Sequence, residues 1–203
     1  MQFLNIWLKK FVVGIMIIGI TGKYASGKGE IAGYLKKKGF EYFSFSAMIE
    51  EECKNRWLPV KRENTIKVAN ELRQKHGNSY LAKRIISSMD KEKNYVVESF
   101  RNPDEVNEFK KLPDFRLLLV DAPVEVRYDR SVDRKRHMDS DFTSFEKFKE
   151  LEEFESKNPN KSAQQLDECA KMADIKIANN STLAALQKKV DSAVKKISLG
   201  AME

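Results

Sequence analysis

Gly22-Lys23-Tyr24-Ala25-Ser26-Gly27-Lys28-Gly29 is the stretch that decides the fold. It fits the pattern G-x-x-x-x-G-K and stands between the apolar run Ile17 to Thr21 and a segment with helical periodicity, Lys28 to Lys38. In such a loop the backbone N–H groups converge on phosphate oxygens, and the lysine adds a point charge. The pattern therefore predicts that this loop holds the phosphates of ATP. The residues expected to contact the nucleotide are Gly22, Lys23, Ala25, Ser26, Gly27, Lys28, Gly29 and Glu30, with a catalytic role for Lys28.

The last position of the motif departs from the usual pattern, in which a serine or threonine hydroxyl contacts Mg²⁺. Gly29 and Glu30 follow Lys28 here, so direct hydroxyl ligation at position 29 is impossible. Glu30 either contacts the water shell of the metal or simply favours the positive helix N-terminus. We still expect Mg²⁺ to bridge the β- and γ-phosphates, as in other phosphoryl-transfer sites.

Strands alternate with helices along the rest of the chain. Apolar or aromatic runs predict further strands at 40–45, 94–99, 115–121 and 174–179, and helical patterns fill the intervals. This alternation predicts an α/β fold with three α/β/α layers and a five-stranded parallel sheet, whose ligands lie at the carboxyl ends of the strands. The expected domain covers 16–198, with an acceptor-side helical subdomain at about 46–90, a mobile lid at about 127–160 and a tail at 199–203.

The N-terminal residues 1–15 are expected to be an extension ahead of the first core strand, which begins near Met16. The apolar run Phe11 to Ile20 is too short to span a bilayer, and no small-residue cleavage site follows it, so we expect no membrane attachment. Cys53 and Cys169 have no metal-ligand spacing. A reducing, cytoplasmic compartment is the simplest inference.

The formal net charge of +7 over 203 residues suits an anionic ligand, because a cationic field steers phosphates toward a protein. Lys and Arg are spread along the whole chain, without a basic tract interleaved with aromatic residues or a recognisable nucleic-acid motif. The expected partner is therefore a small nucleotide rather than a nucleic acid, and the protein is expected to be a monomer or a homodimer.

Polar residues at the end of the third predicted strand are the next candidates for the site. Val97-Glu98-Ser99-Phe100-Arg101 closes that strand. Because parallel strands deliver their carboxyl ends to one edge of a sheet, Glu98 and Arg101 are expected to face the phosphate loop. The alternative is that both are solvated loop charges, which is the commonest place for such residues.

Three arginines share one face of a helix that follows the fourth strand. Arg127, Arg130 and Arg134 lie three or four residues apart. Charge develops on the equatorial oxygens during phosphoryl transfer, so arginines on a closing lid would stabilise the transition state. We predict catalytic roles for Arg130 and Arg134 and substrate binding for Arg127. Their alternation with Asp129 and Asp133 also fits an exposed ion-pair face.

These segments resemble the dephospho-coenzyme A kinase and nucleoside monophosphate kinase (adenylate kinase-like) branch of P-loop NTPases over nearly all of 16–198. The resemblance rests on the loop, on Val120-Asp121-Ala122-Pro123, on the arginine-rich lid and on the closing segment 173–180. Gly27-Lys28-Gly29-Glu30 is similar to an uncharacterised, mainly archaeal kinase-like group. The segments 39–44, 101–106 and 164–167 also resemble the kinase-like domain associated with some deoxycytidylate deaminases, although the zinc motif of the deaminase is absent.

The resemblance implies roles for several residues. Glu98 would orient water bound to the metal, and the loop with Asn179 and Asn180 would hold the adenine. Arg101 would hold the phosphate of the acceptor, as both a substrate-binding and a catalytic residue. An N-cap at Asn180 or Ser181 is the structural alternative for that loop.

The second strand end bears on the choice of acceptor. Dephospho-coenzyme A kinases have an Asp there as general base for a sugar hydroxyl, whereas this chain has Ser44-Phe45-Ser46. An ionised phosphate acceptor needs no such base. The sequence therefore favours an ATP-dependent nucleotide kinase whose acceptor is a (deoxy)nucleoside monophosphate, with Ser46 as a hydrogen-bonding contact. Ser46 also fits the N-cap of the next helix. Dephospho-coenzyme A kinase-type hydroxyl phosphorylation, and a nucleotide sensor or ATPase that regulates a partner, are the alternatives.

Overall fold

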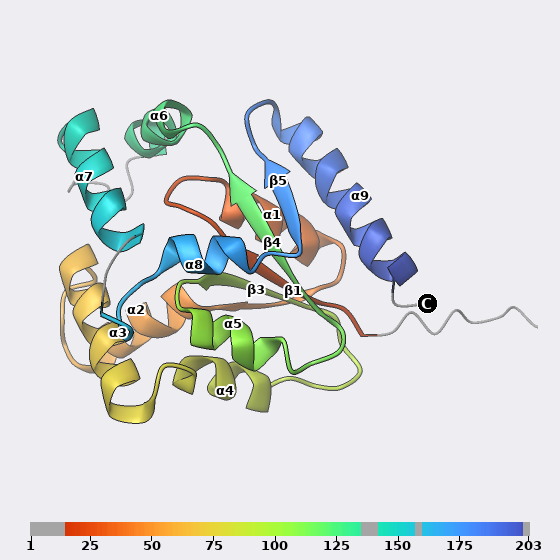
Figure 1. Ribbon diagram of the computed structural model, residues 1–203, viewed down its shortest axis with the longest axis horizontal. Helices are drawn as coiled ribbons and strands as arrows, with labels where there is room; N and C mark the ends of the chain where they lie inside the picture. Colours follow the sequence, from red (N-terminus) through yellow and green to blue (C-terminus); the bar gives the residue numbers. More distant parts are fainter. Residues whose placement is uncertain (1–14, 135–141, 157–159, 201–203) are drawn as a thin grey trace, which may run out of the picture.

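A central sheet of five parallel strands organises the residues that the structure describes, which are 15–134, 142–156 and 160–200. In this computed structural model the spatial order of the strands is β2-β3-β1-β4-β5, and every pairing is parallel (Figure 1). This confirms the predicted sheet. The strands are β1 (Ile17–Thr21), β2 (Glu41–Ser44), β3 (Tyr95–Phe100), β4 (Phe115–Asp121) and β5 (Ile175–Ala178).

Helices cover both faces of the sheet, as predicted for three layers (Figure 1). Apolar residues of α1 and α9 pack on one face together with Ile18 and Ile20 of β1, while α2, α3, α4, α5 and α8 pack on the other together with Ile17. Both faces of β1 are therefore buried, which explains its continuous apolar sequence. The helices are α1 (Lys28–Lys37), α2 (Phe45–Asn55), α3 (Arg62–His76), α4 (Tyr80–Ser87), α5 (Pro103–Phe109), α6 (Val124–Arg134), α7 (Phe145–Ser156), α8 (Leu166–Lys171) and α9 (Leu183–Gly200).

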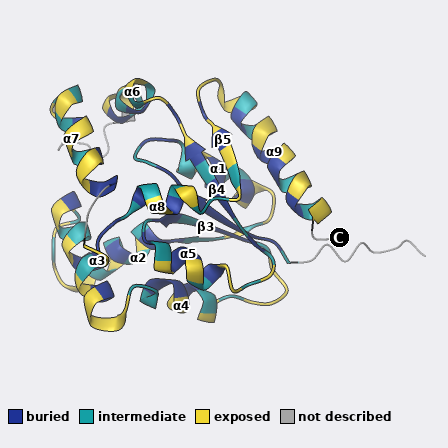
Figure 2. Ribbon diagram, viewed as in Figure 1, coloured by how far each residue is buried: buried dark blue, intermediate teal, exposed yellow. Residues whose placement is uncertain are grey.

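The buried residues concentrate on the sheet and on the inward faces of these helices (Figure 2). The long C-terminal helix α9 shows this pattern, because Leu186, Val190, Ala193 and Ile197 are its buried residues and recur at helical spacing. No helix within the described ranges has both the length and the apolar content needed to cross a membrane.

The start of α2 differs from the expectation. Ser44, the last residue of β2, is the N-cap, and its Oγ accepts a hydrogen bond of 3.2 Å from the backbone N–H of Ala47. The prediction of Ser46 as the cap was wrong because the chain turns directly from strand to helix, without a connecting loop. The hydroxyl of Ser46 lies instead in the first turn of α2.

Several expected segments lie partly or wholly outside the described residues. These are 1–14 of the extension, 135–141 and 157–159 of the lid, and 201–203 of the tail.

Candidate active site

The phosphate loop leaves the carboxyl end of β1 and runs into the N-terminus of α1, as predicted. Two of its glycines cannot be replaced without strain. Gly22 has φ 142°, and a Cβ there would lie 2.1 Å from the carbonyl oxygen of Val120. Gly27 has φ 102°, and its Cβ would lie 2.2 Å from Nδ2 of Asn179. The glycine spacing of the motif is therefore set by the close approach of β4 and of the segment after β5.

Lys28 folds back over this loop. Its Nζ donates hydrogen bonds of 2.8 Å to the carbonyl oxygens of Gly22 and Lys23. The ammonium is thus held at the mouth of the loop, next to the N-terminus of α1. A helix N-terminus and a lysine side by side form an anion site whose potential favours phosphate.

Asn179, which lies far from the phosphate loop in the sequence, contacts this loop and holds it in place. Its Nδ2 donates a 2.8 Å hydrogen bond to the carbonyl oxygen of Ser26, and its backbone N–H donates to Asp121 O at 2.7 Å. Arg130 of α6 donates through Nη2 to the carbonyl oxygen of Asn179 at 3.0 Å. Arg130 therefore lies beside the segment that was expected to hold the adenine, and Asn180 is exposed next to it.

Arg127 has a different environment from the open arginine face that was expected. Only 4% of Arg127 is exposed, and its guanidinium donates to both carboxylate oxygens of Glu152, at 2.5 and 2.8 Å. Its Nε donates to the carbonyl oxygen of Ala122 at 2.8 Å. These bonds occupy the guanidinium and hold α6 against α7, so substrate binding by Arg127 stays a prediction. Only the backbone of Arg134 is described, so its catalytic role also stays a prediction.

Glu152 links this pair to the phosphate loop, because Nζ of Lys23 lies 3.0 Å from its carboxylate. Burial alone would raise the pKa of Glu152, but the hydrogen bonds from Arg127 and Lys23 outweigh it and lower the pKa below the ordinary range of a carboxyl group. Glu152 is therefore ionised at neutral pH and holds Lys23 of the phosphate loop and Arg127 of α6 together.

A cavity lies next to the loop on the face of the sheet that α2 and α3 cover, with about 530 Å³ of empty space, part of it open to solvent. Its lining includes Ser46 and Arg101, two of the three residues for which substrate binding was predicted, but not the third, Arg127. Tyr24 of the phosphate loop also lines it, so the cavity and the loop share a wall. The lining residues are Tyr24, Phe45, Ser46, Ile49, Glu50, Arg62, Thr65, Ile66, Ala69, Arg73, Leu81, Ser99, Arg101, Glu155 and Gln164.

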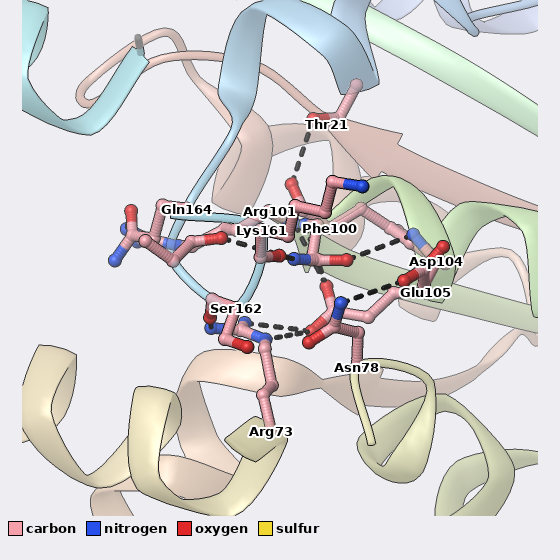
Figure 3. Close-up of polar contacts among 12 residues, drawn as sticks. Thr21, Arg73, Asn78, Phe100, Arg101, Asp104, Glu105, Lys161, Ser162 and Gln164 are labelled. Carbon is pink, nitrogen blue, oxygen red and sulfur yellow. Dashed lines mark hydrogen bonds and ion pairs between the residues drawn. The ribbon is translucent and has the colours of Figure 1, made fainter. Parts of the chain in front are cut away.

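Arg101 is fixed in this cavity by a buried polar network (Figure 3). Its backbone N–H donates to Glu105 at 3.1 Å, and its Nη1 donates to Oε1 of Gln164 at 2.7 Å. Glu105 is fully buried and also accepts two hydrogen bonds from Arg73. Asn102 and Glu105 form a capping box that starts α5. The predicted anion-binding arginine is therefore preorganised by the helix that follows it.

Arg62 is a site residue that the sequence reasoning missed. It lies at the first position of α3, forms a 2.7 Å ion pair with Glu155, and stacks over the rings of Tyr24 and Phe142 at 5.1 and 4.9 Å. The carboxylate of Glu155 also lies 3.8 Å from Arg101. One signal was available: a cation in the first turn of a helix opposes the helix dipole, so it needs another reason to be there.

Glu98 is the carboxylate nearest the end of β3, and it pairs in register with Ile20 of β1, just before the phosphate loop. Its Oε1 accepts a 2.6 Å hydrogen bond from Tyr42, while its buried Oε2 has no hydrogen-bond partner among the described residues. Burial, together with this hydrogen bond, raises the pKa of Tyr42, so the phenol stays protonated.

One protein oxygen, Oε2 of Glu98, is available to a magnesium ion that is held mainly by phosphate and water. The unsatisfied oxygen of Glu98 can orient a water molecule on such an ion. Within the described residues no group of three or more His, Cys, Asp or Glu is placed to hold a metal. Mg²⁺ in phosphoryl-transfer sites typically keeps several waters and uses few protein ligands.

The fold and the loop define this protein as a P-loop kinase-like domain. A family model described as an AAA domain matches residues 18–157. A "UPF0200 protein" of Sulfurisphaera tokodaii is 30% identical over 184 residues, which cover 90% of this chain and 98% of the relative. The chain therefore belongs to the UPF0200 proteins and to that AAA domain family.

Solved structures support the same fold. Shikimate kinase from Aquifex aeolicus has a TM-score of 0.54 and 18% identity, over 91% of this chain and 99% of that one. Dephospho-CoA kinase from Campylobacter jejuni has a TM-score of 0.53 and 18% identity, over 91% and 98%. At such identities the likeness establishes the fold alone.

Proposed function

We propose that this protein transfers the γ-phosphoryl group of ATP to a small anionic acceptor, a (deoxy)nucleoside monophosphate. The observation that supports this is the cavity with Arg62 and Arg101, which shares Tyr24 with the phosphate loop. Phosphoryl transfer depends mainly on positioning the two reactants and on neutralising charge, so two adjoining anion sites are the essential requirement.

Each group in the site has a role in this proposal. Lys28 and the loop amides hold the β- and γ-phosphates, and Arg130 stays beside the adenine of the donor. Arg101, with Arg62, holds the phosphate of the acceptor. Glu98 would hold a water molecule of a bound Mg²⁺, and the ion would supply charge neutralisation on the phosphates.

The acceptor is proposed to be a phosphate rather than a hydroxyl because of the residues at the start of α2. Ser46 stands where a hydroxyl-directed kinase of this branch has a carboxylate base, and a monophosphate is already ionised at neutral pH. Two arginines on the cavity wall also suit a dianion better than a neutral alcohol.

The test is a coupled assay for ADP release with a panel of nucleoside monophosphates, deoxynucleoside monophosphates and dephospho-coenzyme A. Acceptor-dependent ADP release and a phosphorylated product would support the proposal. Lys28→Ala should lower turnover by roughly 10²–10³-fold or more, because it removes a cation that stabilises the transferring group. Lys37→Ala, at the exposed end of the same helix, should have no effect.

A nucleotide sensor is the second candidate, and one observation favours it. Arg62 and Arg101 already share the counterion Glu155, and Gly29 offers no hydroxyl to the metal. Tight ATP binding without turnover on any acceptor would support the sensor and contradict the kinase.

The proposed setting is the cytoplasm. Cys53 and Cys169 are both buried free thiols, which is usual in a reducing compartment.

A further inference from the structure

The charged side chains that line the acceptor cavity differ in whether the protein itself neutralises them. Arg62 and Arg101 share Glu155, and Arg73 is paired with Glu105. The carboxylate of Glu50 has no hydrogen bond or ion pair with any described residue, although it lines the same cavity. Glu50, which is half-buried, is thus the one charged cavity side chain in the described part of the chain that the protein itself does not pair.

Ser46 lies one helical turn before Glu50 on α2, about 6 Å away along the helix axis. Its hydroxyl also lines the cavity and has no partner among the described residues. Phe45 and Ile49 alternate with these two polar residues along the cavity wall, and Ile66 of α3 adds to the apolar surface. Two side chains that can form hydrogen bonds with a ligand thus border an apolar wall, and arginines lie elsewhere in the same cavity.

This arrangement suits a ligand with an apolar body and an edge that donates hydrogen bonds. An ionised carboxylate can only accept hydrogen bonds, so it requires N–H or O–H donors from the ligand. Guanine presents two adjacent N–H donors, on N1 and on its amino group, which match the two carboxylate oxygens. Adenine and cytosine place a ring nitrogen acceptor beside their amino group, and uracil places carbonyl oxygens on both sides of its N–H.

We propose that Glu50, assisted by Ser46, recognises the N–H edge of guanine, so that the acceptor is GMP or dGMP. This inference rests on the proposed kinase function, because it assigns the acceptor of that same cavity. Glu50 is a specificity residue in this proposal. It does not take a proton from the reacting oxygen.

The test compares GMP, dGMP, IMP and AMP as acceptors and as ligands, with binding measured by calorimetry in the presence of a non-hydrolysable ATP analogue. IMP keeps the ring N–H of guanine but lacks the amino group. GMP should exceed IMP and AMP in kcat/KM by roughly 10- to 100-fold, the usual effect of a hydrogen bond to a charged group. Glu50→Gln should remove most of this preference, mainly by raising the KM for GMP.

Glu51→Gln is the matched control, since it removes the same charge from the exposed face of the same helix and should leave the preference unchanged. Thermal unfolding of both variants checks that they fold. A preference for AMP, or an unchanged preference for GMP in Glu50→Gln, would overturn the inference. The inference would also be overturned if Glu50→Gln lowered kcat at constant KM with dephospho-coenzyme A as the acceptor. That result would make Glu50 a general base.

The two proposals fail in different ways. The kinase proposal fails if no acceptor supports turnover. If GMP nevertheless binds and Glu50→Gln weakens this binding, Glu50 still recognises guanine. If turnover occurs with a pyrimidine nucleotide or AMP instead, the kinase proposal stands and the assignment of guanine is wrong.

Discussion

The guanidinium of Arg62 lies 2.7 Å from the carboxylate of Glu155, and only 8% and 5% of the two side chains are exposed. This pair joins the first turn of α3 to the last turn of α7. Removing one partner of a buried pair leaves an uncompensated charge, which costs about 3 kcal/mol or more. Glu155→Leu should therefore lower the free energy of unfolding by about that amount in urea titrations.

The double variant Arg62→Met with Glu155→Leu should recover much of that loss, because apolar residues can replace a buried ion pair at little cost. Lys147→Ala breaks the exposed pair with Glu150 on α7 and serves as the control, with an expected loss of less than about 1 kcal/mol. Equal losses in the single and double variants would contradict a role for the uncompensated charge.

Gly29→Ser should make the protein bind Mg²⁺ more tightly, so that catalysis reaches its full rate at a lower concentration of the metal. A Cβ at Gly29 meets nothing within 4 Å, so the hydroxyl that the motif usually provides fits there without strain. We expect an activation constant for Mg²⁺ that is several-fold lower, measured by titrating the metal at fixed ATP. Gly29→Ala adds the same Cβ without the hydroxyl, and identical behaviour of the two variants would argue against the hydroxyl as the missing ligand.

Gly27→Ala should weaken both the fold and nucleotide binding. The added methyl group would meet Nδ2 of Asn179 at 2.2 Å, and the φ of 102° is strained for any residue with a Cβ. Gly33→Ala, in the middle of α1 with open space around its Cβ, should stabilise the protein by up to about 1 kcal/mol. Melting temperatures with and without ATP would separate these effects, and a Gly27→Ala protein that binds ATP normally would contradict the account of the loop.

The local sequence pattern was sufficient to predict those parts of the structure that are formed by one contiguous segment. The bounds of β1 and β4 agree with the predicted runs, because both strands are apolar and lie inside the sheet. The phosphate loop was predictable for the same reason, since its motif, strand and helix are contiguous. Ser46 and Arg101 line one cavity, as expected from the rule that parallel strands end at a common edge, while their roles in binding stay predictions.

Ion pairs between segments that are far apart in the chain could not be predicted from a single sequence. Helical spacing placed Arg127 and Arg130 on a common face, but it gave no sign that Glu152 would bury the first of them. Arg62 likewise gains its role only from the approach of α7 and of Tyr24. An ion pair depends on which helices pack together, and hydrophobic periodicity does not contain that information.

Acidification should loosen the link that Glu152 makes between α6 and the phosphate loop. The folded-state pKa of Glu152 lies below its ordinary value because Arg127 and Lys23 stabilise the charged form. Its contribution to stability is therefore complete at neutral pH and is lost as the pH falls through the acidic range below the ordinary carboxyl pKa. The melting temperature of the natural protein should fall more steeply between pH 7 and about pH 3 than that of Glu152→Gln.

Glu150→Gln, which changes an exposed carboxylate on α7, is the control and should follow the natural protein. Parallel melting curves for Glu152→Gln and the natural protein would show that the buried carboxylate is not the group that titrates.

The hydrogen bond from Asn179 to Ser26 joins residues that are 153 positions apart. On the ribosome, the glycine-rich turn is synthesised early, but the side chain that braces it arrives only after nearly all of the domain has been made. A nascent chain therefore lacks this brace until its last strand and the residue after it have been made, and a fragment that stops short of that strand would lack it permanently.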